Sequence, residues 1–300
     1  MKRVLRAVAA LLVLGAVVFM LLTRPEPLAA VEFASEEADL ENGERMFWAG
    51  GCASCHADPD ADEGDAPLLS GGLELETPFG TFVAPNISSH ETAGIGGWST
   101  LDFVNAMARG VSPDGRHYYP AFPYTYYQRM RPDDLRDLKA FIDTLPASDN
   151  VAAGNVLQFP YGIRRGLGLW KRRYLDGEGF EVDESAPPDV ERGRYLVQGP
   201  GHCGACHTPR DRFGGAIPDR YLAGTTGENA AEEAPNITPH ENGIGSWSKG
   251  DIAYSLATGF DPDFDSFGGG MVKVQENLAK LVEDDRDAIA AYLKSIQPLP

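Results

Sequence analysis

The chain has 300 residues, of which 43% are hydrophobic and 23% charged, so it is long enough for two ordinary domains that each bury a core. Its formal net charge is −18, which argues against a nucleic-acid partner because such a partner needs a basic face. An acidic surface instead favours a basic docking partner and steers its approach.

The N-terminus predicts a signal segment or membrane anchor within residues 1–30. A basic start, MKRVLR, precedes the uninterrupted apolar run Ala7–Leu22, and the sequence TRPEP then ends the run. Sixteen apolar residues lie between the length of a signal-peptide core and that of a full membrane span, which is about 20 residues. Arg24 directly after the run is unusual for a cleaved signal, so we favour an uncleaved anchor over cleavage near Ala29. Either interpretation puts the bulk of the chain outside the cytoplasm.

Similarity between the two halves indicates an internal duplication. Three stretches of the first half return in the same order in the second: 41–60 as 191–211, 84–110 as 234–259, and 131–146 as 282–298. Cys52 corresponds to Cys203, and the other pairs keep nearly the same offset. Because order and spacing hold over about 100 residues, we predict two copies of one domain, 36–147 and 189–298, joined by a structured linker, 148–188.

Each copy has the same predicted elements. A first helix, 35–49 or 189–198, leads into a cysteine motif, and a Gly/Pro-rich loop follows. Ser99 and Ser248 are predicted N-caps of a short helix, each with an aspartate three residues on, and a closing helix starts at RPDDL or EDDRD. No alternating β pattern of any length is visible, so the fold class is mainly α with long loops. Loops of that length need something to organise them, such as a large buried cofactor.

The linker contains one predicted helix. Within 164–174, apolar residues alternate with basic ones to form an apolar stripe: Leu167, Leu169, Trp170 and Tyr174. We expect this amphipathic segment to pack one domain against the other.

All four cysteines lie in two C-x-x-C-H motifs, formed by Cys52, Cys55 and His56 and by Cys203, Cys206 and His207. The pattern is typical of c-type haem attachment. Residues three apart share one face of a helical turn, so two thiols there can form thioether bonds to the two vinyl groups of haem. The histidine that follows supplies the proximal imidazole to the iron. The alternatives are a thioredoxin-like redox pair, structural zinc and plain disulfides, and none explains a histidine after both pairs.

Several strings resemble those of the dihaem or multihaem cytochrome c subunits that accompany periplasmic dehydrogenases, such as alcohol dehydrogenase. They are CASCH and CGACHTPR, APNIS and APNIT, GIGGWS and GIGSWS, YYPAFPY, and QFPYGIRRGLGLWK, and the resemblance covers roughly residues 38–298. It implies two tandem class I cytochrome c domains, where such family members often have three. It also implies two covalently bound haem c groups and an electron-transfer role. A periplasmic dehydrogenase would be the donor, and a quinone, an oxidase or another cytochrome the acceptor.

The predicted distal iron ligands differ between the copies. Met271, in SFGGGMVKV before the closing helix, stands where a class I cytochrome c carries its axial methionine, so we predict that it binds the second iron. In the first copy the family's YPAMPY string reads YPAFPY, and Phe122 cannot bind iron. We rank Met130 first as its replacement, an open or water-bound iron second, and His117 after these.

Other residues of the resembling strings have two interpretations each. Trp98 and Trp247 are expected either beside the porphyrin or in the plain core. Asn86 and Asn236 are expected near the haem propionates or as braces of their loop. His202, directly before Cys203, is expected behind the ligands or facing solvent.

Two functions remain open on the sequence. Electron relay by two haems in tandem is favoured, because no catalytic triad, phosphate loop or nucleotide fingerprint is visible. The alternative is a dihaem enzyme, a peroxidase or small-molecule dehydrogenase, that uses an open first haem. Such a site needs a distal acid–base residue, for which His117 and Arg116 are candidates.

Overall fold

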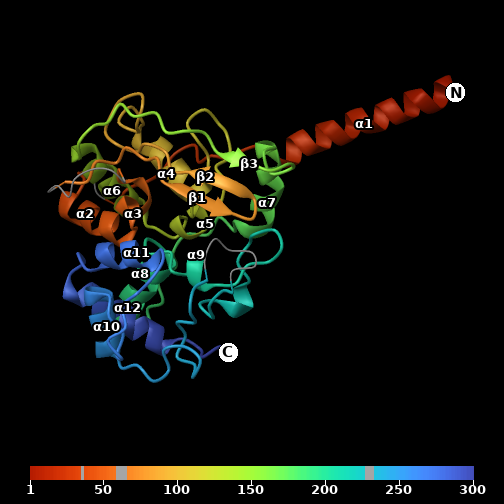
Figure 1. The fold of residues 1–300 in the computed structure, drawn as a ribbon. Helices are drawn as coiled ribbons and strands as arrows, with labels where there is room; N and C mark the ends of the chain where they lie inside the picture. Colours follow the sequence, from red (N-terminus) through yellow and green to blue (C-terminus); the bar gives the residue numbers. More distant parts are fainter. Residues whose placement is uncertain (35–36, 59–65, 227–232) are drawn as a thin grey trace.

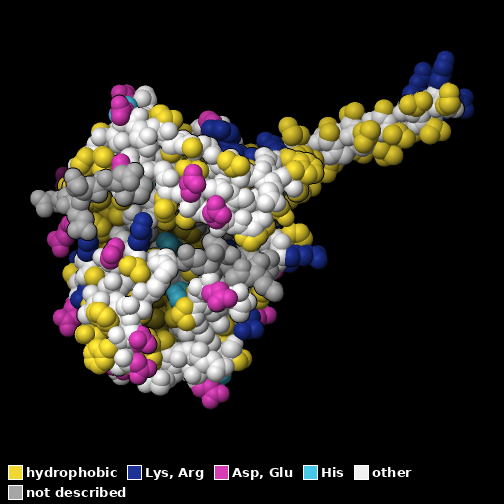
Figure 2. All heavy atoms as spheres, in the orientation of Figure 1, with side chains coloured by type: hydrophobic (Ala, Val, Ile, Leu, Met, Phe, Trp, Pro, Cys, Tyr) yellow, Lys and Arg dark blue, Asp and Glu magenta, His cyan; other side chains and the backbone are white. Residues whose placement is uncertain are grey.

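The computed structural model describes residues 1–34, 37–58, 66–226 and 233–300. The N-terminal helix α1 (Lys2–Leu22) projects from the body, and the first repeat lies between α1 and the second repeat (Figure 1). The surface of α1 is hydrophobic on the face shown, with Lys and Arg side chains at its N-terminal tip (Figure 2). In the described part of the chain, α1 is the one helix long and apolar enough to cross a membrane.

The two repeats contain equivalent helices in the same order. The first has α2 (Leu40–Ala49), α3 (Cys52–His56), α4 (Thr100–Arg109), α5 (Tyr124–Tyr127) and α6 (Pro132–Thr144). The second has α8 (Pro188–Gln198), α9 (Gly204–His207), a 3-10 turn η2 (Pro218–Arg220), α10 (Lys249–Thr258), α11 (Met271–Leu278) and α12 (Glu283–Ser295). Ser99 and Ser248 form the predicted capping boxes of α4 and α10. The mainly α prediction is therefore confirmed.

The structure also contains a small antiparallel sheet that the sequence did not predict. Strands β1 (Glu74–Thr77) and β2 (Gly80–Val83) form a hairpin, and β3 (Val156–Leu157) of the linker pairs with β2. Strands of two to four residues are too short to give a recognisable alternation of polar and apolar residues.

The linker continues from β3 through a 3-10 turn, η1 (Arg164–Gly166), into helix α7 (Leu167–Tyr174). The Lys171 ammonium donates to the Gly110 carbonyl of the first repeat at 2.6 Å, and the Trp170 indole donates to the Phe213 carbonyl of the second at 2.9 Å. This confirms that α7 packs between the repeats. It also packs against the end of α1, where a Cβ on Gly168 would lie 2.5 Å from Cα of Thr23.

Each repeat is built on a close crossing of its first and last helices. A Cβ on Gly43 of α2 would lie 2.2 Å from the Asp137 carbonyl oxygen of α6, and one on Gly193 of α8 would lie 1.8 Å from the Ala288 carbonyl oxygen of α12. Only glycine allows the two backbones to approach this closely. Most of the buried hydrophobic residues of both repeats belong to one continuous cluster, with Phe47 and Leu138 from the first and Leu196 and Ile289 from the second.

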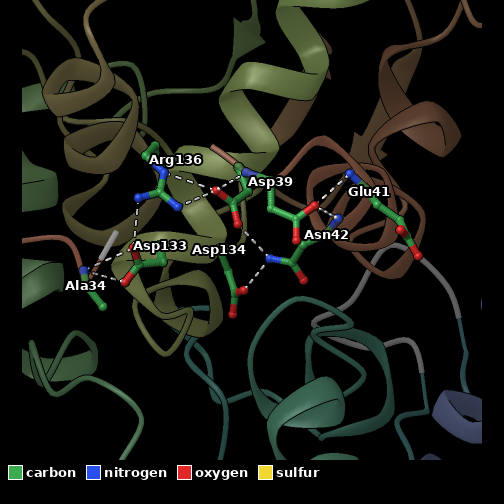
Figure 3. A network of polar contacts seen from close by, with 8 residues as sticks. Ala34, Asp39, Glu41, Asn42, Asp133, Asp134 and Arg136 are labelled. Atoms are coloured by element: carbon green, nitrogen blue, oxygen red, sulfur yellow. Dashed lines mark hydrogen bonds and ion pairs between the residues drawn. The ribbon is translucent and has the colours of Figure 1, made fainter. Parts of the chain in front are cut away.

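A polar network fixes the crossing of α2 and α6 (Figure 3). The Asn42 amide donates to the carboxylates of Asp134 at 2.7 Å and Asp137 at 2.9 Å. Arg136 forms ion pairs with Asp137 at 2.6 Å and Asp133 at 2.9 Å. Because Asn42 is 92 and 95 residues away in sequence from its two partners, its hydrogen bonds hold the start of the repeat against its end.

The first helix starts later than the sequence predicts. The Asp39 carboxylate accepts hydrogen bonds from the amides of Glu41 and Asn42, so it caps the helix, and α2 begins at Leu40. The expected start at Ser35 lies outside the described residues. The helix also does not run into the cysteine motif, because Gly51 adopts a left-handed backbone conformation (φ 57°) between α2 and α3.

The glycine crossing predicts a large effect of one methyl group. Gly193→Ala is expected to lower the free energy of unfolding by about 1–3 kcal/mol, because the added carbon overlaps backbone atoms of α12. Denaturant unfolding followed by circular dichroism measures it. The matched control is Gly250→Ala on the exposed side of α10, where nothing lies closer than 3.6 Å and a gain of about 0.5–1 kcal/mol is expected. Equal effects at the two positions would contradict the proposed crossing.

Candidate functional site

The two cysteine motifs each occupy one short helix, α3 or α9. None of the four cysteines is in a disulfide, so the disulfide alternative is not realised. Burial raises the pKa of Cys52 and of Cys203 to about 12, which keeps both as neutral thiols. Structural zinc needs four ligands in one place, and within the described residues no three His, Cys, Asp or Glu side chains come together as a metal site. A thioredoxin-like pair would need a βαβ unit, whereas the small sheet here is antiparallel.

Each motif histidine is oriented by a proline carbonyl. His56 Nδ1 lies 2.8 Å from the Pro85 oxygen, and His207 Nδ1 lies 2.7 Å from the Pro235 oxygen. A carbonyl oxygen only accepts, so Nδ1 carries the proton and the Nε2 lone pair is left available. Burial lowers the pKa of both histidines, which favours the neutral imidazole that a metal requires.

The two prolines are functional residues that the sequence analysis missed. Of the APNI strings, only Asn86 and Asn236 were given an expected role, and the proline contact was not predicted. The available signal was the return of APNI at nearly the same offset, with the proline 29 or 28 residues after the motif histidine. The carbonyl of a proline carries no side-chain chemistry, so residue type alone could not reveal the role.

The asparagines of the same strings brace their loops. The Asn86 amide donates to the Ser148 carbonyl at 2.8 Å, and the Asn236 amide donates to the Leu299 carbonyl at 2.7 Å. Each thus ties the loop bearing the proline to the chain that follows the closing helix. The bracing role expected of both asparagines is therefore present in the structure. Trp98 and Trp247 are partly buried against the hydrophobic cluster.

Met271 and Phe122 occupy equivalent places in the two repeats. Met271 is the first residue of α11, and Phe122 lies just before α5, which precedes the closing helix of its own repeat. Both side chains are partly buried and pack against the hydrophobic cluster. Phe122 contacts the rings of Tyr118 and Tyr127, with centroids 5.7 and 5.6 Å away.

Met130 and its counterpart Leu281 have matching environments. Each is 4% exposed, and each amide donates to the carbonyl three residues earlier, that of Tyr127 or Leu278. This symmetry favours a packing role for Met130. That Met130 binds the first iron stays a prediction.

The candidate acid–base residues, His117 and Arg116, have their partners outside the two cysteine motifs. His117 is buried, and its Nε2 lies 2.8 Å from the Thr23 carbonyl oxygen at the end of α1. Arg116 is on the surface and forms an ion pair with Asp114 at 2.6 Å. The structure thus ties His117 to the foot of α1 and Arg116 to a surface turn.

The second repeat contacts the first motif through α11. The Ser54 hydroxyl of α3 donates to the Lys273 carbonyl at 3.1 Å and accepts from the Asn277 amide at 2.9 Å. The helix that begins with Met271 thus packs on the cysteine motif of the other repeat.

The reciprocal contact runs from α5 of the first repeat to the second motif. A Cβ on Gly204 of α9 would lie 2.9 Å from the Tyr126 ring. His202 contacts the Tyr127 ring at 5.3 Å, and its Nε2 lies 3.2 Å from the Gly50 carbonyl oxygen. His202 is partly buried and lies at the contact between the repeats, where burial lowers its pKa.

The two motifs therefore face each other across an approximately symmetric contact. The labels of α3, α11, α5 and α9 gather at the middle of the molecule (Figure 1), and histidine side chains are visible in the recess between the repeats (Figure 2). Cys206 lies close enough to Cys55 to raise its pKa further, in addition to burial. Each motif offers two thiols on one turn and one neutral, oriented imidazole, a donor set that fits covalently attached haem.

Comparison with known proteins places both repeats in one family. The family model for cytochrome c matches residues 40–146 and 190–297. The chain is 48% identical over 296 residues to a diheme cytochrome c-type protein of Cereibacter sphaeroides, and the match covers 99% of each chain.

Two further relatives are longer than this chain. The fructose dehydrogenase cytochrome subunit of Gluconobacter japonicus is 34% identical over 276 residues, and the cytochrome c subunit of a quinone alcohol dehydrogenase of Gluconobacter oxydans is 35% identical over 291 residues. Both matches cover 91% of this chain but only 56% and 59% of the relatives.

The donor sets predict independent haem attachment. Replacing both Cys203 and Cys206 by alanine is expected to lower the haem content from two groups per chain to one, as the pyridine haemochrome absorbance per protein measures. Replacing Cys52 and Cys55 is the matched variant, with the same loss. A double variant that retains both haems would contradict the assignment of its motif.

Proposed function

The chain belongs to the cytochrome c family, and on that premise we propose that it is a periplasmic, membrane-anchored dihaem cytochrome that relays electrons from a dehydrogenase to the respiratory chain. It carries two covalently bound haem c groups and has an electron-transfer role. The observation that carries the relay is the contact between the two motifs, with α11 packed on α3 and Tyr126 of α5 packed against α9.

When bound, haem iron supplies reversible one-electron chemistry, and the protein fixes where that chemistry occurs. In this proposal the cysteine pairs attach each group at the contact between repeats. His56 and His207 act as proximal ligands, each held by its proline carbonyl. Contacts such as that of Ser54 with Asn277 keep the two motifs at a fixed separation, so an electron can pass between them without a domain movement.

The donor and acceptor follow from the relatives and from charge. Two relatives are named as cytochrome subunits of dehydrogenases, so we propose a dehydrogenase as donor. The acceptor would be a quinone, an oxidase or another cytochrome. The net charge of −18 favours a partner with a basic docking face. The apolar helix α1 would hold the protein beside these partners as an uncleaved anchor.

An electron carrier is favoured over a dihaem enzyme. A peroxidase site needs a positioned acid–base group beside an open iron. His117, the histidine candidate, has its Nε2 at the Thr23 carbonyl, and Arg116 is paired with Asp114 on the surface.

The proposed distal ligand of the second haem is Met271. Met271→Ala is expected to leave both haems attached but to lower one of the two midpoint potentials, because methionine ligation raises the potential of a haem with a proximal histidine. The change should be a clearly measurable part of the roughly 0.8 V range that axial ligands cover. Potentiometric titration with absorbance measures it, and two unchanged one-electron steps would exclude Met271.

Because Phe122 has no thioether, we propose that the distal side of the first haem differs from that of the second. Phe122→Met is expected to raise the potential of the first haem and to suppress cyanide or carbon monoxide binding there, because it restores a thioether at the place of Met271.

Met130→Leu is the companion variant. An unchanged titration assigns Met130 to the core beside its counterpart Leu281, whereas a lowered potential assigns it to the iron. Peroxide turnover by the wild-type protein would contradict the carrier function.

A further inference from the structure

The linker forms a distinct surface around the end of α1, which we term the foot surface. It combines basic residues with exposed apolar ones: Arg24, Arg164, Arg165, Arg172 and Arg173 with Phe159, Tyr161, Ile163 and Leu169. Phe159 is 88% exposed, which is unusual for a phenylalanine in a folded domain. Figure 2 shows hydrophobic and basic side chains together beside the foot of α1.

Arginines of the foot surface bind the end of α1 directly. The Arg165 guanidinium donates to the Met20 carbonyl at 2.7 Å and to the Thr23 hydroxyl at 3.0 Å. Arg172 donates to the Leu22 carbonyl at 2.6 Å. The last carbonyls of a helix have no partner within it and carry partial negative charge, so cations here cap α1. The body is thereby joined to α1 by several contacts beyond the chain connection.

The rest of the foot surface is connected to the same point. Arg164 donates to the His117 carbonyl at 3.0 Å, and the His117 ring contacts the Thr23 carbonyl. The Tyr119 hydroxyl donates to the Tyr161 carbonyl at 3.0 Å, and the Arg164 guanidinium lies over the Tyr119 ring at 4.7 Å. Tyr161 and its neighbours Phe159 and Ile163 therefore belong to one surface with the end of α1.

The length of α1 determines where the foot surface would lie relative to a bilayer that α1 crosses. Its apolar run Ala7–Leu22 gives about 24 Å of helix, and the basic turn before the run extends α1 to about 31 Å, compared with about 30 Å of hydrocarbon in a bilayer. Thr23 and its contacts would then lie where hydrocarbon meets headgroups. Aromatic side chains are enriched at this level, and each Lys or Arg near an anionic surface contributes about 1 kcal/mol. A group of cations is notable in a chain whose net charge is −18.

We propose that the foot surface lies in the headgroup layer of the membrane and binds anionic phospholipid. This rests on the proposed anchoring of the chain by α1. Phe159, Tyr161, Ile163 and Leu169 enter the interface. The exposed Arg24 and Arg173 bind phosphate groups, because Arg172 is already paired with the end of α1 and with Glu26. The bilayer, rather than a dehydrogenase subunit, is the occupant, because the surface is continuous with the end of the proposed span. The contact fixes how the two repeats are held relative to the membrane.

Nitroxide accessibility on the full-length holoprotein tests the proposal, in phosphatidylcholine vesicles with about one third phosphatidylglycerol. Three single variants carry the label: Phe159→Cys in the foot surface, Val13→Cys inside α1, and Phe264→Cys in the loop after α10. Phe264 is the matched control, because it is 74% exposed and belongs to the repeat farther from α1 (Figure 1). The native thiols do not react with the label once they hold haem.

The ratio of collision rates with oxygen and with a water-soluble nickel chelate is expected to be several-fold higher at Phe159→Cys than at Phe264→Cys, and high at Val13→Cys. In vesicles of phosphatidylcholine alone, the ratio at Phe159→Cys should fall. A high ratio at Val13→Cys with equal ratios at the two phenylalanine positions would overturn the membrane contact and leave the anchor intact. A low ratio at Val13→Cys would overturn the anchor itself. An unchanged ratio without anionic lipid would overturn the role of the arginines.

Discussion

The hydrogen bond from a histidine Nδ1 to a proline carbonyl determines the geometry of each site. It fixes the tautomer and the direction of His56 and His207, and the rest of each repeat holds the two partners of this bond in place. The glycine crossing brings the first and last helices together, and the asparagine after each proline ties the loop to the end of the repeat. Although the distance in sequence from His56 to Pro85 is 29 residues, both ends of their hydrogen bond are fixed by contacts across the repeat.

Because of the duplication, the two repeats share the same arrangement of histidine and proline at the cysteine motif. The contact between the repeats gives the two motifs different environments. Each repeat uses the segment before its closing helix, α5 or α11, to cover the motif of the other. The first residue of α11 is Met271, whereas the equivalent place before α5 is held by Phe122 within a group of tyrosine rings. The same segment thus serves both the contact between repeats and the proposed distal side of its own haem. A substitution such as Phe122 therefore alters the environment of one haem without disturbing the shared framework.

Sequence reasoning succeeded where the signal is local or repeated. The C-x-x-C-H motifs, the capping boxes at Ser99 and Ser248 and the duplication all depend on residues close in sequence or on an alignment of the halves. It failed where the partner is distant. Strand β3 of the linker pairs with β2 from far away in sequence, His117 contacts a carbonyl 94 residues away at Thr23, and His202 contacts Gly50 of the other repeat. Such contacts depend on tertiary packing, and no periodicity in the sequence encodes them.

The distribution of charge connects these observations with the proposed place of the protein. Acidic residues outnumber basic ones by 44 to 26, and yet Arg165 and Arg172 both donate to backbone carbonyls at one end of α1. Capping a helix end requires few cations, and the exposed phenylalanine and tyrosine beside them contribute nothing to capping. A lipid interface accounts for both, since it attracts cations and accepts aromatic side chains. The acidic remainder of the surface is then directed toward proteins in solution, which separates the membrane contact from docking of the redox partner.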